Sequence, residues 1–445
     1  MAVAALALPG AHGAKESRLS DQPVPLQIET FPKRPAPLVQ IGQNPFLGSG
    51  YIAPGFIVPT GAVWQPVFIA YGTMRSGLQT FDNGPGVQTT EWANRLDLFG
   101  NLYLTPTERI LIGLRPLDRN NLFSGHRFKH PAGEGGVERF NGNIRTLFFE
   151  GDFGELFPEL DPRDGRSLDY GFSFGRQPLN FQDGIMINDV VDSIGITRSS
   201  LFAFGSNAAH VTVLFGWNEI NHNAVADVDA RFYMLSGAAD YAFGTVEADF
   251  AYVPSRNRAI GDGLFAGLAW ITRFGKIAST TRLNFSWALD AESASLQDGV
   301  LFFQQLNYTP AGGHNNLYLD FFAGFDNYRS AMRAPDAGGP LGATGLLFAA
   351  AGLGSYGAPL GNFADRSVGG ALGYQMFFNQ RRRQVLFELG SRARTDRGGT
   401  LASAAGVRFQ QAFGRHLILQ LDGFGLANPN AKDGFGLRTE LLCKF

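Results

Sequence analysis

Charged residues stand two positions apart in several segments that are otherwise rich in apolar residues. Arg95 with Asp97 and Arg438 with Glu440 are two such pairs. Side chains two residues apart lie on the same face of a β-strand, so each pair would present both charges to one side of a sheet. A face lined with guanidinium and carboxylate groups could conduct ions or polar solutes along a hydrated path.

The segment 433–445 indicates which face of the predicted sheet meets lipid. One face carries Phe435, Leu437, Leu441 and Phe445, and the other carries Arg438, Glu440 and Lys444. An Arg or Lys on the lipid face near the midplane costs roughly 2 to 4 kcal/mol, so the charged face is expected to line the lumen. The same parity in the other strands predicts these pore-lining residues: Arg95, Asp97, Arg109, Arg115, Arg145, Arg282, Glu388, Arg392, Arg394, Arg408, Arg438 and Glu440.

One part of this lining is predicted to be strongly cationic. Arg392 and Arg394 fall on one predicted strand, and Arg408 falls on the next. A wall of arginines would favour the passage of anions. The alternative is that such charges pair with neighbouring carboxylates and stiffen the barrel.

The composition is typical of a chain in which alternate residues of each strand face lipid and water. It has 445 residues with 57 glycines, 40 phenylalanines and only 17% charged residues, yet its mean hydropathy is -0.05. The longest apolar run, 342–354, is too short to cross a membrane as a helix. A net charge of -2 gives no reason to expect a nucleic-acid partner.

Segments in which apolar and polar residues alternate are separated by residues typical of turns. This pattern predicts an all-β fold, a transmembrane antiparallel β-barrel of about 18 strands. An even number of strands is usual for bacterial single-chain barrels. The predicted strands are 62–79, 90–104, 107–117, 140–152, 167–177, 193–203, 208–218, 229–242, 245–254, 263–273, 277–289, 298–308, 314–327, 366–377, 383–395, 402–412, 416–427 and 433–445.

Five Phe-Gly pairs support this count, because all of them follow even-numbered predicted strands. Glycine allows the positive φ of a tight turn, and phenylalanine suits the aromatic girdle at a membrane interface. These turns are therefore expected at the periplasmic end, together with both termini. The pairs are Phe153-Gly154, Phe204-Gly205, Phe243-Gly244, Phe274-Gly275 and Phe413-Gly414.

The opposite connections 117–137, 178–192 and 329–365 are long and are expected to be surface loops of unassigned role. Residues 1–14 resemble the end of a secretory signal peptide. Residues 15–60 contain many prolines, which lack the backbone N–H that donates hydrogen bonds between strands. They are therefore expected to form a periplasmic or barrel-mouth segment. The barrel is then predicted to span 61–445.

The segment Gly175-Arg-Gln-Pro-Leu-Asn-Phe-Gln-Asp-Gly184 resembles the Gly-Arg-Gln strand-to-loop motif of the alginate-export family of outer-membrane proteins. On this resemblance, Gly175, Arg176, Gln177, Asp183 and Gly184 form a loop motif. The resemblance implies an 18-strand barrel with an Arg-rich lumen that exports or passes a polar or anionic solute. The eighth periplasmic turn, long in alginate exporters, is only Phe413-Gly414-Arg415 here.

An enzyme is not expected, because the seven histidines include only one close pair, His126 and His130, in a loop. One cysteine excludes a disulfide within the chain, and no haem-attachment motif or metal site is predicted, so no cofactor is expected. The predicted function is an outer-membrane channel or exporter. The alternative is a structural or partner-scaffolding barrel with a closed lumen, including a sheath for an electron-transfer protein. The expected partners are outer-membrane lipid, lipopolysaccharide and the barrel assembly machinery, with periplasmic or secretion proteins left open.

Overall fold

The computed structural model describes residues 37–42, 55–84, 87–119, 121–160, 162, 168–290, 293–310, 313–396, 401–429 and 432–445. The predicted signal peptide and most of the segment 15–60 lie outside these ranges. All described residues belong to the unit Ala36–Phe445. No helix among them is long and apolar enough to cross a membrane.

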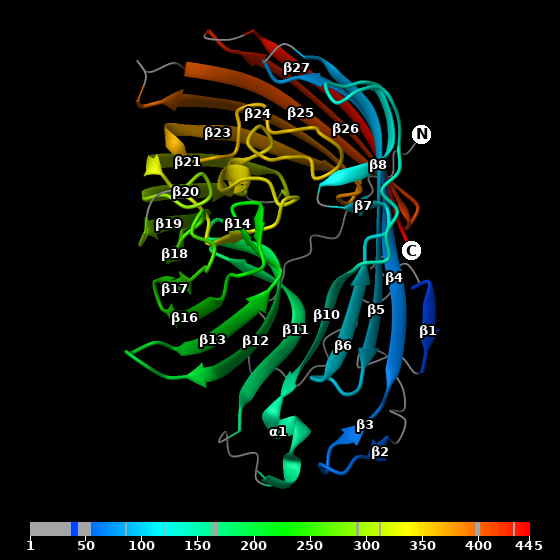
Figure 1. Ribbon diagram of the computed structural model, residues 1–445, viewed down its shortest axis with the longest axis vertical. Coiled ribbons are helices and arrows are strands. Elements are labelled where there is room, and N and C mark those ends of the chain that lie inside the picture. The colour runs from blue at the N-terminus through cyan, green and yellow to red at the C-terminus, as the bar shows by residue number, and fades with distance from the viewer. Residues whose placement is uncertain are drawn as a thin grey trace, which may run out of the picture. The chain divides into compact units, whose positions relative to one another are not determined.

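Eighteen strands form a closed antiparallel barrel (Figure 1). The barrel closes where the last strand pairs with the first, with Phe435 opposite Asp82 and Lys444 opposite Thr73. The barrel strands are β4 (Val67–Asp82), β5 (Thr89–Tyr103), β6 (Arg109–Leu114), β10 (Ile144–Asp152), β11 (Tyr170–Phe181), β12 (Ile187–Leu201), β13 (Ala208–Asn218), β16 (Phe232–Tyr241), β17 (Gly244–Val253), β18 (Gly263–Phe274), β19 (Ile277–Ala288), β20 (Gly299–Tyr308), β21 (Asn316–Asn327), β23 (Asp365–Phe378), β24 (Arg383–Arg394), β25 (Leu401–Phe413), β26 (Leu417–Ala427) and β27 (Gly434–Lys444).

Shorter elements fill the connections. Part of the proline-rich segment is ordered, because β1 pairs with the first residues of β4, with Val39 opposite Ala70. The remaining elements are β1 (Val39–Ile41), β2 (Phe56–Ile57), β3 (Val63–Trp64), β7 (Asp118–Arg119), β8 (Leu122–Lys129), β9 (Gly135–Val137), α1 (Phe153–Leu156), β14 (Ile220–His222), β15 (Val225–Asp227), β22 (Met332–Arg333) and the 3-10 helices Pro158–Leu160 and Pro340–Thr344.

The predicted fold class and strand number are confirmed, but the predicted loop 178–192 is wrong. The strands β11 and β12 continue through it and leave only residues 182–186 as a turn. Pro178 is tolerated in β11 because it lies beyond Arg176, the last residue of β11 that pairs with β10.

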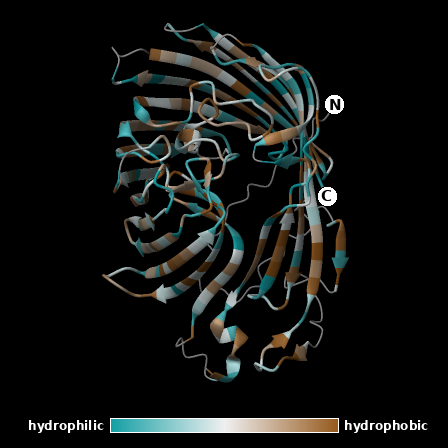
Figure 2. Ribbon diagram, in the orientation of Figure 1, coloured by the Kyte–Doolittle hydropathy of each residue, from teal (hydrophilic) through white to brown (hydrophobic). Residues whose placement is uncertain are grey.

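Hydrophobic and hydrophilic residues alternate along the strands, as the bands in Figure 2 show. In β27 the side chains of Phe435, Leu437 and Leu441 are exposed on the outside, whereas Arg438 and Glu440 are buried. This arrangement confirms the parity predicted from the sequence of the last strand. Stacked aromatic rings, such as Phe285 and Trp287, lie on neighbouring outward positions.

The five Phe-Gly pairs do all lie at one end of the barrel, after the fourth, sixth, eighth, tenth and sixteenth barrel strands. Gly205, Gly244, Gly275 and Gly414 have positive φ values of 76°, 138°, 61° and 59°. Gly154 differs because it lies in α1, where Asp152 caps the helix by accepting a hydrogen bond from the Gly154 N–H. We refer to this end of the barrel as the Phe-Gly end.

Apolar side chains fill part of the barrel interior, which was predicted to be polar. Leu347, Phe348 and Leu360 of the connection between β21 and β23 pack against Phe322 and Leu301 on the strands. The apolar run 342–354, too short for a membrane helix, supplies two of these residues. The interior is therefore divided between an apolar core and a charged wall.

Candidate functional site

The connection between β21 and β23, residues 328–364, folds into the barrel, and we call it the inner loop (yellow in Figure 1). Many of its side chains are buried, and those of Tyr328, Leu347 and Phe348 have no exposed surface. The strand β22 within it pairs in parallel with the start of β12, with Asn188 opposite Arg333. The inner loop thus starts against β12 and continues to the opposite wall.

Charged wall residues hold the far part of the inner loop by its backbone. Arg75 donates to the carbonyl oxygen of Ala351 at 3.0 Å, and Arg95 donates to that of Gly352 at 3.3 Å. Arg392 donates to the carbonyl oxygens of Leu360 and Phe363 at 3.0 and 2.6 Å. Charge-assisted hydrogen bonds are stronger than neutral ones, so these contacts fix the loop across the lumen.

The turn 182–186 between β11 and β12 also enters the barrel. Gln182 donates to the Asp249 carboxylate at 2.6 Å, and the buried Arg282 binds Asp183 at 2.6 Å. Arg282 also pairs with Glu247 at 2.9 Å. Side chains of β17 and β19 therefore fix this turn on the inner side of the wall.

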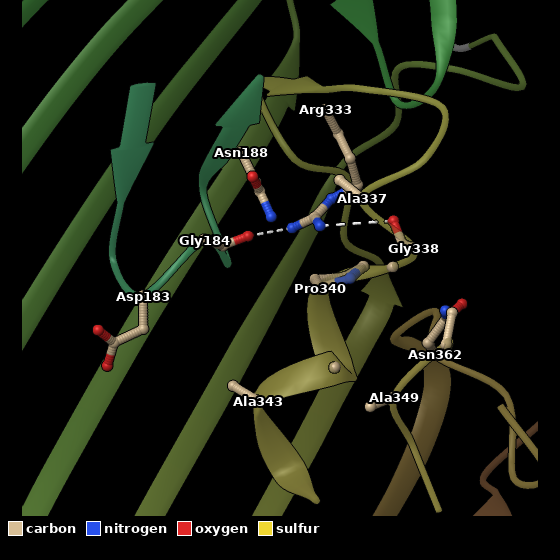
Figure 3. Close-up of a pocket in the computed structure, with 13 residues that line it drawn as sticks. Asp183, Gly184, Asn188, Arg333, Ala337, Gly338, Pro340, Ala343, Ala349 and Asn362 are labelled. Carbon is tan, nitrogen blue, oxygen red and sulfur yellow. Dashed lines mark hydrogen bonds between the residues drawn. The ribbon is translucent and has the colours of Figure 1, made fainter. Parts of the chain in front are cut away.

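The turn 182–186 and the inner loop form one inserted unit. The N–H of Ala331 donates to the Met186 carbonyl oxygen at 2.9 Å, and the Ser330 hydroxyl donates to that of Ile185 at 2.7 Å. Arg333 is 1% exposed and donates to the carbonyl oxygens of Gly184 and Gly338, as Figure 3 shows. A buried guanidinium thus connects the two segments.

A pocket of about 320 Å³ lies beside Arg333 (Figure 3). Asp183, Asn188 and Asn362 supply its polar side chains, and the rest is mainly glycine and alanine. Burial lowers the pKa of Arg333 to about 10, so it is charged at neutral pH. Among the described ion pairs none joins Arg333 to a carboxylate, and its hydrogen bonds go to carbonyl oxygens and to the Ser330 hydroxyl. The nearby Asp189 also stabilises the positive charge.

A second pocket, of about 370 Å³, lies between the inner loop and the wall of β5, β6 and β10. Its charged lining includes Arg95, Asp97, Arg115, Arg145 and Asp336. Arg115 lies 2.8 Å from Asp97 and also pairs with Asp336, which Arg145 contacts at 2.9 Å. Asp189 also lines the pocket and accepts hydrogen bonds from Asn221. The pocket is therefore lined by charges of both signs, most of them in ion pairs.

Asn188 and Ala337 line both pockets, which are therefore adjacent. Burial raises the pKa of the Asp336 carboxyl, but Arg145 and Arg115 outweigh burial and hold its pKa below the usual value. Asp336 is thus a carboxylate at neutral pH, and it attaches the inner loop to two arginines of the wall. We call the two pockets and their charged lining the constriction.

The constriction gathers four of the twelve predicted lining residues: Arg95, Asp97, Arg115 and Arg145. Arg392 contacts the inner loop, as does Glu388, which accepts hydrogen bonds from the N–H groups of Leu346 and Leu347. The other six lie outside it in ion pairs or clusters of their own. They are Arg109 with Glu150, Arg282 with Asp183 and Glu247, Arg394 with Asp396, and Arg408, Arg438 and Glu440 in one network with Asp422 and Arg75.

The predicted cationic wall of Arg392, Arg394 and Arg408 is wrong. Arg408 pairs in register with Leu386, six positions from Arg392, which corresponds to about 20 Å along the strand. Arg394 binds Asp396 at 2.7 Å near the rim, and Arg408 binds Asp422 at 2.7 Å. Neighbouring strands do not bring these residues together, because the antiparallel register separates them.

The predicted loop motif is divided between the two faces of the barrel. Gly175 has φ +125°, and a Cβ there would lie 2.3 Å from the Leu147 carbonyl oxygen, so glycine is required. Arg176 lies on the outward parity and pairs with Asp192 at 2.7 Å, whereas Gln177 is buried and binds Ser193. Asp183 and Gly184 reach the pocket beside Arg333.

Several residues that hold or line the constriction were not predicted from the sequence. Arg75 could have been found, because it shares parity with Gln79 on β4 and is the cross-strand partner of Arg95. Asp336 and Arg333 carry no such signal, because strand periodicity says nothing about a loop that folds inward. Their assignment depends on the structure.

The histidine pair shows no catalytic arrangement. The Ala132 N–H donates to Nδ1 of His130 at 3.0 Å, so the ring proton is on Nε2, which faces the Ser355 hydroxyl at 3.3 Å. This imidazole cannot accept the proton of Ser355. Within the described ranges, no cluster of three or more His, Cys, Asp or Glu side chains could hold a metal.

No protein-family model and no curated protein matches the sequence. Solved structures do match. OpdK of Pseudomonas aeruginosa, solved with vanillate, has TM-score 0.56 and 12% identity over 85% of this chain and 98% of its own. OccAB4 of Acinetobacter baumannii has TM-score 0.54 and 9% identity over 87% and 100%. OccK5 of P. aeruginosa has TM-score 0.53 and 11% identity over 85% and 98%. This chain therefore has the closed 18-strand β-barrel fold of outer-membrane channels.

Proposed function

We propose that this protein is an outer-membrane channel for small polar solutes, with a preference for anions. The observation that carries the proposal is the constriction, in which two adjacent pockets of about 320 and 370 Å³ lie between the inner loop and the charged wall. Ligand pockets of roughly 300 to 1,000 Å³ accommodate small molecules. A chain of sugars would need a wider passage, so monomeric solutes are favoured over polysaccharides.

Arg333 supports the preference for anions, because no carboxylate forms an ion pair with it among the described residues. A fixed positive charge in a narrow passage favours anions. OpdK was solved with vanillate, an aromatic carboxylate, and a carboxylate of that size would suit the pocket beside Arg333. Membership of the alginate-export-like family is supported by the segment 175–184 and stays part of this proposal.

The proposal includes the orientation of the barrel in the outer membrane of a Gram-negative cell. The Phe-Gly end and both termini would face the periplasm, because tight turns are typical of that side. The outward aromatic residues would meet lipid and lipopolysaccharide, and the barrel assembly machinery would insert the chain. Of the twelve predicted lining residues, four are proposed to act in permeation by lining the constriction and Glu388 and Arg392 by holding the inner loop, and the other six are proposed to line the rest of the passage.

Planar-bilayer recordings of the purified protein test this proposal. We expect stepwise conductance. In a salt gradient, the reversal potential should shift toward the Nernst potential of the anion, and millimolar benzoate should block the current. We also expect liposome swelling with small carboxylates but not with oligouronates. A barrel that inserts and gives no current would contradict the proposal and favour the closed, structural alternative.

A further inference from the structure

Two buried carboxylates of the wall bind the backbone of the inner loop rather than a cation. Asp97, Asp422 and Glu440 of the same wall each form an ion pair with an arginine. Glu388 and Glu91 are 1% and 5% exposed, and among the described residues neither has a cation within ion-pair distance. Both instead accept hydrogen bonds from N–H groups of the inner loop.

Glu388 holds the middle of the inner loop. Its carboxylate accepts from the N–H of Leu346 at 2.8 Å and from the N–H of Leu347 at 2.7 Å, as well as from the Tyr318 hydroxyl. Gly345 lies so close that a Cβ there would be 2.4 Å from Oε2 of Glu388, which leaves no room for a water between them. The carboxylate therefore contacts the loop directly.

Glu91 holds the loop further along. It accepts hydrogen bonds from the Ser355 N–H, from the Ser355 hydroxyl at 3.3 Å and from Gln79 at 2.7 Å. Gly354 has φ +66°, and a Cβ there would lie 2.6 Å from Oε1 of Glu91. At both anchors a glycine with positive φ precedes an N–H that donates to a buried glutamate, since Gly345 has φ +152°.

We infer that Glu388 and Glu91 are positioning residues that hold the inner loop across the lumen and thereby set the size of the constriction. The inference rests on the proposed function, because it concerns the same passage. A glutamine amide in place of either carboxylate replaces one acceptor oxygen by a donor and removes the charge that strengthens the remaining hydrogen bonds. Loss of either carboxylate would therefore loosen the loop at its anchor.

Other polar and charged groups also lie near these carboxylates. Tyr318 and Asp320 of β21 and Arg408 of β25 lie near Glu388. Arg127 of β8 is the cross-strand partner of Glu91, and His130 lies beyond Ser355. The test therefore uses glutamine variants at a single pH, so that only the two glutamates change.

The first experiment reports on the loop itself and needs no transport. In a Cys443→Ser background, Leu347→Cys and Leu353→Cys place thiols at two side chains that have no exposed surface. Maleimide labelling is measured at pH 7.5 in folded, detergent-solubilised protein, with folding checked by heat-modifiable gel migration. We expect Glu388→Gln to accelerate labelling at position 347 by about tenfold or more, and Glu91→Gln to do so at position 353.

Glu108→Gln is the matched control, because Glu108 has no exposed surface and its described hydrogen bonds come from the Thr105 and Thr107 hydroxyls and the Asp152 N–H rather than from the loop. Labelling in this variant should stay within about twofold of the background. Equal labelling in all variants would overturn the inference. Equal acceleration by Glu108→Gln would also overturn it, because that result would reflect general loosening of the barrel.

The second experiment measures conductance at pH 7.5. The Glu91→Gln/Glu388→Gln double variant should show a single-channel conductance that differs from that of wild type, whereas Glu108→Gln should keep the wild-type value. Absence of current in every variant would contradict the proposed function while the labelling result still stands. Wild-type conductance in the double variant would overturn the role of these two glutamates in setting the size of the constriction.

Discussion

Arg145 is the extra residue of a β-bulge in β10, and its guanidinium lies 2.9 Å from the carboxylate of Asp336. Ile144 is opposite Leu114 and Thr146 is opposite Gly113, so Arg145 has no residue opposite it on β6. A bulge changes the direction of a side chain and frees it from the ladder. Arg145 was predicted from strand parity to face the lumen, but it does so because of this bulge, since the regular buried positions of β10 are Thr146 and Phe148.

Replacement of Asp336 by Asn should make the channel more selective for anions. The change leaves Arg115 and Arg145 without one carboxylate, and the side chains of Arg115 and Asp336 are only 15% and 10% exposed. Breaking a buried pair typically costs about 3 kcal/mol, so the inner loop should also become less stable. The reversal potential in a KCl gradient measures the first effect, and the apparent melting temperature measures the second.

Arg394→Gln is the control for this experiment. Among the described ion pairs Arg394 has only that with Asp396, and its side chain is 44% exposed. Exposed ion pairs contribute from about zero to 1 kcal/mol, so stability and reversal potential should hardly change. If Arg394→Gln shifts the reversal potential as much as Asp336→Asn does, the constriction does not determine selectivity.

The contribution of Asp336 to stability should depend on pH in a defined direction. The arginines hold its pKa below the usual value, so this contribution is fully present above the unfolded pKa of about 3.9. It is lost as the pH falls through the lower pKa of the folded state. Melting temperatures of wild type and Asp336→Asn should therefore differ by a constant amount above about pH 4 and converge below it. Convergence at pH 6 would contradict the assignment.

The tight turns at the Phe-Gly end should differ in their need for glycine. Gly205 has φ +76°, and a Cβ there would have no described neighbour within 4 Å, so Gly205→Ala should cost only the backbone strain of about 1 to 2 kcal/mol. Gly244 has φ +138°, and its Cβ would lie 2.3 Å from the Ile271 carbonyl oxygen. Gly244→Ala should thus be clearly more destabilising in thermal unfolding, and equal losses would contradict this reasoning.

The barrel could be predicted from the sequence because each strand and turn depends on residues that are close together in the chain, and because the same pattern recurs from strand to strand. The alternation in β27 follows from the two-residue period of a strand, and the Phe-Gly pairs follow from the need for glycine in a tight turn. The register between two consecutive strands follows from the length of the turn that joins them, so it can be predicted only when that length is known. The separation of Arg408 from Arg392 shows that strand number alone does not place two residues side by side.

The constriction could not be predicted in the same way, because it depends on contacts between distant segments. Arg333 and Gly184 are 149 positions apart, and Arg75 and Ala351 are 276 positions apart. The apolar run 342–354 is evident in the sequence, but its burial inside a barrel follows only from the strands that surround it. Charges that were predicted to line the lumen, such as Arg95 and Arg392, bind the backbone of this loop.

Substitution of Arg333 tests most directly whether the turn 182–186 and the inner loop are held together as one unit. Its guanidinium donates to the carbonyl oxygens of Gly184, Ile185 and Gly338 and to the Ser330 hydroxyl. Methionine has a similar length but no donor, so Arg333→Met would leave buried acceptors unsatisfied and separate the turn 182–186 from the inner loop. We expect larger single-channel conductance together with weaker anion preference.

Arg333→Lys separates charge from geometry in the same position. A lysine keeps one positive charge but cannot reproduce the planar fork of donors that connects three carbonyl oxygens. If charge alone matters, Arg333→Lys should retain the anion preference and differ from Arg333→Met; if the fork matters, both variants should show the larger conductance. We expect the lysine variant to retain most of the anion preference and to show the larger conductance, because Arg333 serves both as a fixed charge beside the pocket and as the link between Gly184 and Gly338. Wild-type conductance in both variants would show that the turn and the inner loop are held together without Arg333.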